Sequence, residues 1–181
     1  MDHLDDIDQR SLRGADRRIL SALHAHGGDP RVAAAARALS RAGEHGALWL
    51  AAGVAGAAVD GARRGAWLRG TAVTAGAHLV SMGVKRVVRR PRPAHVEPLV
   101  RTLGRHSFPS SHAASAAAAA VAYGALGALG AYMIVPLAAA MCVSRLVVGV
   151  HYPSDVAAGV ALGALTARAG ARWVSTGDAR A

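Results

Sequence analysis

The second half of the chain contains one long apolar stretch without charge. The 39 residues between Arg105 and Arg145 include no Asp, Glu, Lys or Arg. A helix needs about 20 apolar residues to cross a bilayer, so this stretch has room for two crossings. Glycines near its middle and Pro136 divide it. We therefore expect membrane spans at about 112–129 and 131–150.

Three shorter uncharged runs flank the long stretch, at residues 45–59, 70–84 and 156–167. Each alone is short enough to be a buried helix of a soluble protein. A soluble helix of this size normally has a polar face, whereas residues 113–143 show none. The pattern therefore favours an all-α, multi-spanning transmembrane helical bundle of about five spans over a soluble, alanine-rich bundle.

The composition agrees with closely packed helices. The 181 residues include 44 alanines and 21 glycines, and the mean hydropathy is +0.26. Small residues let helices approach one another closely in lipid, and this hydropathy excludes disorder as the general state. A single cysteine, Cys142, excludes an intramolecular disulfide and a cysteine-based zinc site.

The first 45 residues have a different pattern. Apolar residues recur at helical spacing over 19–23 and again over 32–39, with a Gly-Gly-Asp-Pro break at 27–30. This spacing predicts two amphipathic helices, either on the membrane surface or against the bundle, although an ordinary soluble helical hairpin has the same periodicity. The expected division is an interfacial helical segment at 1–45, a membrane domain at 46–175 and a tail at 176–181.

Positive charge gathers in one loop at a predicted membrane boundary. The chain has a formal net charge of +10, and the only acid between Asp60 and Asp155 is Glu97. The only lysine of the chain, Lys85, is the first residue of this basic group, whose other members are Arg86, Arg89, Arg90, Arg92, Arg101 and Arg105. Ammonium and guanidinium are not equivalent at a crowded phosphate, so a lone lysine among 20 arginines suggests a specific role. Nucleic-acid binding is not expected, because the group lies between apolar runs without aromatic stacking platforms.

Three short segments carry the candidate chemistry, and the predicted topology brings them to one membrane face. The second predicted span ends there, the third begins there, and the fourth ends there after crossing back. Six polar side chains can therefore share one interfacial pocket: Lys85, Arg92, His112, Arg145, His151 and Asp155.

These residue types suit phosphoryl chemistry. Guanidinium forks and an ammonium bind phosphate strongly, and one of two histidines can attack while the other protonates the leaving oxygen. Asp155 follows His151 by four residues, within reach to orient its ring. Structural roles stay open, because His112 can be a structural hydrogen-bonding group and Asp155 can cap a helix. A zinc site of His112, His151 and Asp155 is disfavoured by the surrounding positive charge.

The pattern Lys85-x6-Arg92-Pro93, Pro109-Ser110-Ser111-His112 and Ser144-Arg145-x5-His151-x3-Asp155 resembles the three-part signature of the type 2 phosphatidic acid phosphatase family. This family shares its site with the vanadium haloperoxidases. The resemblance covers roughly residues 70–174. One position departs from the pattern, because Ser111 stands where the family usually has glycine.

The resemblance implies a role for each matching residue. His151 would be the nucleophile that forms a phosphohistidine, Asp155 would orient it, and His112 would be the general acid. Neither a metal nor another cofactor is implied. The phosphate oxygens would be held by Lys85, Arg92, Ser110, Ser111 and Arg145.

We therefore expect a membrane-embedded phosphatase that hydrolyses a lipid phosphate monoester or pyrophosphate. Similarity to compact bacterial family members suggests a polyprenyl-linked substrate such as decaprenylphosphoryl-5-phosphoribose. The alternatives are undecaprenyl diphosphate, phosphatidic acid or phosphatidylglycerol phosphate. A haloperoxidase is disfavoured because such chains are normally soluble, and a catalytically silent membrane adaptor should have lost a site residue.

The expected partners are the lipid phosphate substrate and membrane lipids, with no nucleic acid and the oligomeric state left open. We expect a multi-pass protein of the bacterial plasma membrane. The positive-inside rule favours a cytoplasmic active site, because the loop with Lys85 and Arg92 has more additional arginines than the loop at 60–69.

Overall fold

The computed structural model describes residues 2–102 and 104–175, and its regular elements there are helices, which confirms the all-α prediction. The predicted tail at 176–181 lies outside the described residues. The principal helices are α1 (Asp2–Ala25), α2 (Pro30–Ala42), α3 (Ala47–Val59), α4 (Arg64–Val88), α5 (Ser111–Gly124), α6 (Ala128–Val147) and α7 (Pro153–Ser175).

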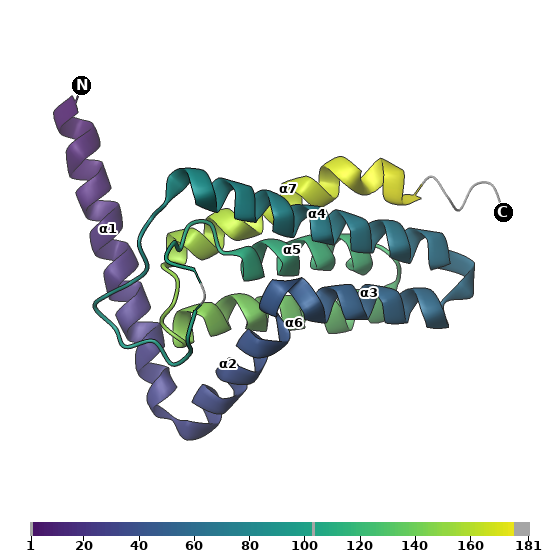
Figure 1. The fold of residues 1–181 in the computed structure, drawn as a ribbon, viewed down its shortest axis with the longest axis horizontal. Coiled ribbons are helices and arrows are strands. Elements are labelled where there is room, and N and C mark those ends of the chain that lie inside the picture. The colour runs from purple at the N-terminus through teal and green to yellow at the C-terminus, as the bar shows by residue number, and fades with distance from the viewer. Residues whose placement is uncertain (1, 103, 176–181) are drawn as a thin grey trace.

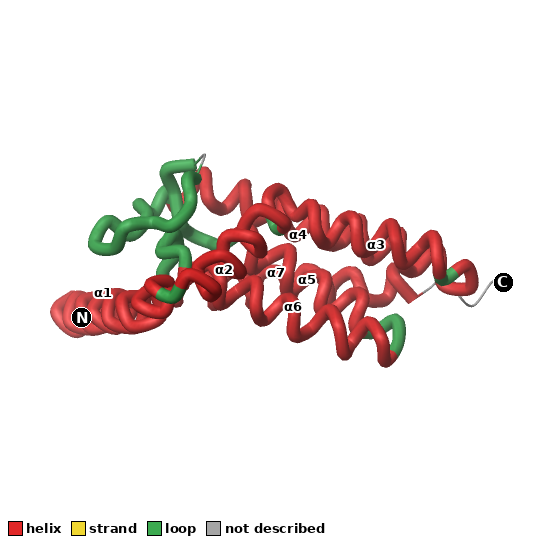
Figure 2. Tube along the Cα trace, turned by 90° about the horizontal axis from the view of Figure 1, so that it is seen from below, coloured by secondary structure: helices red, strands yellow, loops and turns green. Residues whose placement is uncertain are grey.

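Helices α3 to α7 run alongside one another, whereas α1 and α2 cross the bundle at one end (Figure 1). Helix α5 is the central element and packs against α4, α6 and α7. Its alanine-rich sequence is buried on nearly every side, as expected of a helix that is apolar all round. The long loop at 89–110 lies at the end of the bundle where α1 and α2 are found (Figure 2).

The expected spans correspond to helices with different limits. Among the described residues, no helix has the combination of length and apolar character that a bilayer crossing needs. The segment expected at 112–129 is α5, which ends at Gly124 and has 14 residues, or about 21 Å at the α-helical rise. The segment expected at 131–150 is α6, which begins earlier because the chain turns at Gly127.

Two glycines allow α7 to lie directly on α5. A Cβ atom at Gly163 would overlap the Ala114 carbonyl oxygen, and one at Gly159 would lie 2.5 Å from the Ser110 carbonyl oxygen. The close approach places the first turn of α7 beside the first turn of α5, where the Ser110 amide donates to the Asp155 carbonyl at 2.9 Å. Two signature segments thereby become neighbours.

The N-terminal segment forms two helices, as its spacing predicts. The break falls at Asp29, whose carboxylate caps α2 by accepting from the Arg31 amide at 2.7 Å, and Pro30 occupies the first helical position. Leu20 of α1 is fully buried in a cluster with Leu146 of α6 and Val156 of α7. Helix α1 is therefore packed against the bundle.

We expect Gly163→Ala to lower the free energy of unfolding by about 1–3 kcal/mol, because the added methyl group forces α5 and α7 apart. Gly76→Ala is the matched control, since its new Cβ meets no atom within 4 Å and alanine favours the helix. Thermal unfolding of the two purified variants measures the difference. Equal or higher stability of Gly163→Ala would show that α5 and α7 do not need this close approach.

Candidate active site

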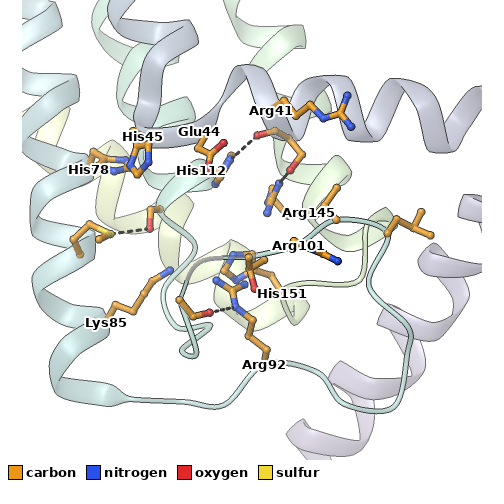
Figure 3. Close-up of a pocket in the computed structure, with 17 residues that line it drawn as sticks. Arg41, Glu44, His45, His78, Lys85, Arg92, Arg101, His112, Arg145 and His151 are labelled. Atoms are coloured by element: carbon orange, nitrogen blue, oxygen red, sulfur yellow. Dashed lines mark hydrogen bonds between the residues drawn. The ribbon is translucent and has the colours of Figure 1, made fainter.

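A cavity of about 510 Å³ opens at the end of the bundle that carries the long loop. Seventeen residues line it (Figure 3). They come from α2 and the residues 44–46 that follow it, the second half of α4, the 89–110 loop, the ends of α5 and α6, and the turn between α6 and α7. Six of the eight predicted site residues are among them: Lys85, Arg92, Ser111, His112, Arg145 and His151. Segments far apart in the sequence therefore converge as the predicted topology requires.

The cavity wall is strongly cationic. Lys85, Arg92 and Arg145 are joined there by Arg41 and Arg101, while Glu44 is the one acid among the described lining residues. Figure 3 shows the Arg41 side chain directed away from the other labelled groups. Like charges around a small space repel one another unless an anion lies between them, so the wall suits an anionic ligand.

Two arginines are held by the protein with donors left over. Arg92 donates from Nε to the Gly104 carbonyl and from Nη1 to the Val150 carbonyl, each at 2.8 Å. Arg145 is 3% exposed and donates from Nη1 to the Ser40 hydroxyl at 2.5 Å, while its buried Nε has no hydrogen-bond partner. A guanidinium has five N–H donors in a fixed fork, so both side chains retain donors for phosphoryl oxygens.

His151 lies on the turn between α6 and α7. Gly149 adopts a φ of +75° in this turn, a conformation that favours glycine. His151 is 2% exposed, and its Nδ1 lies 3.6 Å from Asp155 Oδ2. Because Nδ1 faces the carboxylate, Nε2 is the nitrogen left for a ligand in the cavity.

Burial, together with the positive charges of Arg145, Arg92 and Lys85, lowers the pKa of the His151 imidazole to about 3, against the opposing effect of Asp155. The ring is therefore neutral at physiological pH and has a lone pair to attack with.

Asp155 lies behind His151 and is fully buried. Its Oδ2 accepts from the Tyr152 amide at 2.8 Å, and its Oδ1 accepts from Arg90 Nη1 at 2.9 Å. The carboxylate is thus fixed in place, close enough to stabilise positive charge on the imidazole.

His112 occupies the first turn of α5, on the side of the cavity formed by α2. Its Nε2 lies 3.1 Å from the Ser40 carbonyl oxygen. A carbonyl oxygen only accepts hydrogen bonds, so Nε2 carries the hydrogen in this contact.

The two signature serines have different positions. Ser111 lines the cavity. Ser110 does not, because its fully buried hydroxyl caps α5 by accepting from the Ala113 amide. The resemblance implies a phosphate contact for Ser110, whereas in the structure its side chain is the N-cap of α5.

Sequence reasoning missed a group of supporting residues in and around α1. Arg90 donates from Nη2 to Asp16 of α1 at 2.8 Å, and Asp16 also accepts from the amide and the hydroxyl of Ser154. His24 of α1 donates from Nδ1 to the Val147 carbonyl at 2.8 Å. Helix α1 therefore holds the His151 turn on both sides. No motif marks these residues, although Arg90 belongs to the basic group.

A metal site has no support in the described part of the chain. No group of three His, Cys, Asp or Glu side chains is arranged there to hold an ion. The cationic wall would also repel a divalent cation.

We expect Arg90→Met to lower the free energy of unfolding by about 2 kcal/mol, because Asp16 and Asp155 would then lie near each other without their shared cation. This is less than the ~3–5 kcal/mol typical of a fully buried broken pair, since 24% of the Arg90 side chain is exposed and water screens the charges. Arg86→Met, in the exposed last turn of α4, is the control. Thermal unfolding measures both, and equal stability of the two variants would argue against the network.

Comparison with known proteins identifies the family. A family model for the PAP2 superfamily matches residues 66–178. The chain is 45% identical over 152 residues to the decaprenylphosphoryl-5-phosphoribose phosphatase of Mycolicibacterium smegmatis, covering 81% of this chain and 82% of that protein. It is 42% identical over 137 residues to the protein of the same name from Mycobacterium tuberculosis, covering 75% and 76%. A transmembrane PAP2-type phosphatidylglycerolphosphate phosphatase from Bacillus subtilis has a similar fold, with a TM-score of 0.71, 21% identity and coverage of 90% and 86%. The chain therefore belongs to the PAP2 superfamily.

Proposed function

We propose that the protein hydrolyses the phosphate monoester of a polyprenyl-linked phosphoribose lipid, with His151 as the nucleophile. The observation that carries this proposal is the neutral His151 ring at a cationic cavity, with the Asp155 carboxylate behind it. The names of relatives at 42–45% identity support the same reaction.

In the first step, His151 Nε2 attacks phosphorus as the bond from phosphorus to the leaving oxygen breaks. His112, which takes up a second proton at Nδ1 as the anionic substrate binds, transfers that proton to the leaving oxygen. Lys85, Arg92 and Arg145 stabilise the negative charge on the remaining phosphoryl oxygens. Asp155 offsets the positive charge that the phosphorylated imidazole acquires.

In the second step, water attacks the phosphorus of the phosphohistidine and the phosphorus–nitrogen bond breaks. The neutral His112 accepts a proton from the attacking water, and phosphate is released. Both histidines then have their starting protonation, so the cycle balances without a metal or a redox partner.

The cavity suits a substrate larger than a phosphate group. Its volume of about 510 Å³ falls within the range of about 300–1,000 Å³ typical of whole small-molecule ligands. Glu44, His45 and Thr102 line it beyond the phosphate-binding cations, and their polar groups can bond to sugar hydroxyls. A phosphoribosyl head group therefore fits the size and the polarity.

The proposal places the protein in a membrane, with the lipid tail beside the bundle. Large apolar side chains face outward on several helices, including Val54 of α3 (56% exposed), Leu79 of α4 (69%) and Leu165 of α7 (64%). Exposed apolar surface of this kind marks contact with lipid or a partner. The Bacillus subtilis phosphatase of similar fold is itself a transmembrane protein. The excess of arginine in the 89–110 loop supports a cytoplasmic active site.

We expect His151→Ala to reduce phosphate release by about 1,000-fold or more, as removal of a catalytic nucleophile does. The reaction with ³²P-labelled substrate is quenched rapidly in acid or in base. The wild-type protein should carry a label that survives base but is lost in acid, and the variant should carry no label. His26→Ala, on the exposed end of the α1 segment, is the control. Substantial turnover by His151→Ala would contradict the nucleophile assignment.

The substrate class is tested with purified, detergent-solubilised protein and four lipids. These are decaprenylphosphoryl-5-phosphoribose, phosphatidic acid, phosphatidylglycerol phosphate and a polyprenyl diphosphate. We expect the highest kcat/KM for the phosphoribose lipid, because its sugar can use the polar wall around Glu44 and Thr102. A higher value for any other lipid would assign the protein to that substrate instead, and no hydrolysis of any lipid would favour a silent adaptor.

A further inference from the structure

Ser40, in the last turn of α2, contacts two of the candidate catalytic side chains at once. Its hydroxyl accepts from Arg145 Nη1 at 2.5 Å, and its carbonyl oxygen lies 3.1 Å from His112 Nε2 (Figure 3). Ser40 is 8% exposed, so water competes little for either contact. It also lies outside residues 66–178, where the family model matches.

We propose that Ser40 is a positioning residue of the active site, which aims Arg145 at the phosphate and fixes His112 so that Nδ1 delivers the proton to the leaving oxygen. This inference rests on the function proposed above, because it assigns the proton path within that reaction. It also makes α2 part of the catalytic unit.

The hydroxyl contact decides where the Arg145 donors point. A guanidinium is a rigid plane, so fixing one nitrogen restricts the directions of the other two. Nη1 is fixed by Ser40, the buried Nε has no hydrogen-bond partner, and the Arg145 side chain lines the cavity. The unused donors can then bind a phosphoryl oxygen while the Arg145 side chain stays in one rotamer, so less conformational entropy is lost on binding.

The carbonyl contact decides which His112 nitrogen transfers the proton. Nε2–H donates to the Ser40 carbonyl and keeps its hydrogen throughout the cycle. When the imidazolium protonates the leaving oxygen, it therefore gives up the Nδ1 proton. The neutral ring then accepts a proton from the attacking water at the same Nδ1, so the contact with Ser40 is retained in both steps.

Three serine variants test the Arg145 contact. Ser40→Ala removes the hydroxyl and favours the helix, Ser40→Thr keeps a hydroxyl, and Ser21→Ala changes an exposed serine of α1 as the control. The probe is orthovanadate, which mimics five-coordinate phosphorus. For each variant we measure its dissociation constant by direct binding and its inhibition constant from phosphate release. Thermal unfolding verifies that each variant is folded.

We expect Ser40→Ala to weaken orthovanadate inhibition by about ten-fold or more, as loss of a hydrogen bond to a charged group implies. Ser40→Thr should stay near the wild-type value, and Ser21→Ala should match it. The dependence of kcat on leaving-group basicity should be unchanged in Ser40→Ala, because the backbone carbonyl remains. Wild-type inhibition of Ser40→Ala, or equal losses in the alanine and threonine variants, would overturn the hydroxyl role.

The His112 arm is tested by ¹⁵N NMR of histidine-labelled protein in detergent, with His112→Asn used to assign the signals. At neutral pH we expect the His112 tautomer that carries hydrogen on Nε2. A tautomer with hydrogen on Nδ1 alone would overturn the proposed proton path. Neither the spectrum nor direct vanadate binding requires turnover. If the wild-type protein binds vanadate and shows the expected His112 tautomer but hydrolyses no lipid, the proposed function is rejected. If the wild-type protein hydrolyses lipid but Ser40→Ala binds vanadate with unchanged affinity, the positioning role of Ser40 is rejected.

Discussion

Unbalanced positive charge around one cavity is the constraint on which the rest of the structure depends. Five cationic side chains line this space, and the described lining residues include one acid, Glu44. Their mutual repulsion opposes the empty arrangement, so the scaffold has to hold them individually. Arg92 is tied to two backbone carbonyls and Arg145 to a serine hydroxyl. An anion in the cavity would offset this repulsion, and a preorganised site of this kind favours an anionic transition state.

The same charges set the chemistry of His151. They disfavour a proton on the buried ring, which keeps its lone pair available, but they would equally oppose the positive charge of a phosphorylated imidazole. Asp155 provides the opposing negative charge, and Arg90 and the Tyr152 amide hold that carboxylate in place. Asp16 in turn shares Arg90. His151, Asp155, Arg90 and Asp16 are therefore one electrostatic unit, and its last member, Asp16, belongs to α1.

The convergence of the signature segments could be predicted from the sequence, because each segment stands at the end of an apolar run and the ends of successive helices meet. The family expectation made on that basis is confirmed. The glycines in the middle of the 106–144 run predicted the break, but not the residues at which the two helices end and begin, which are Gly124 and Ala128. Ser40 and Asp16 could not be found at all. Their partners lie 105 and 138 residues away, and neither residue belongs to a motif.

The division of labour between the two parts of the chain follows from these contacts. Most of the cavity lining comes from the region that the family model matches, whereas Ser40 and Arg41 of α2 and the residues Glu44 and His45 that follow this helix lie outside that region. Phosphoryl transfer needs the first set in fixed geometry. Ser40 of the second set holds Arg145 and His112 of the first set, so α2 is part of this geometry.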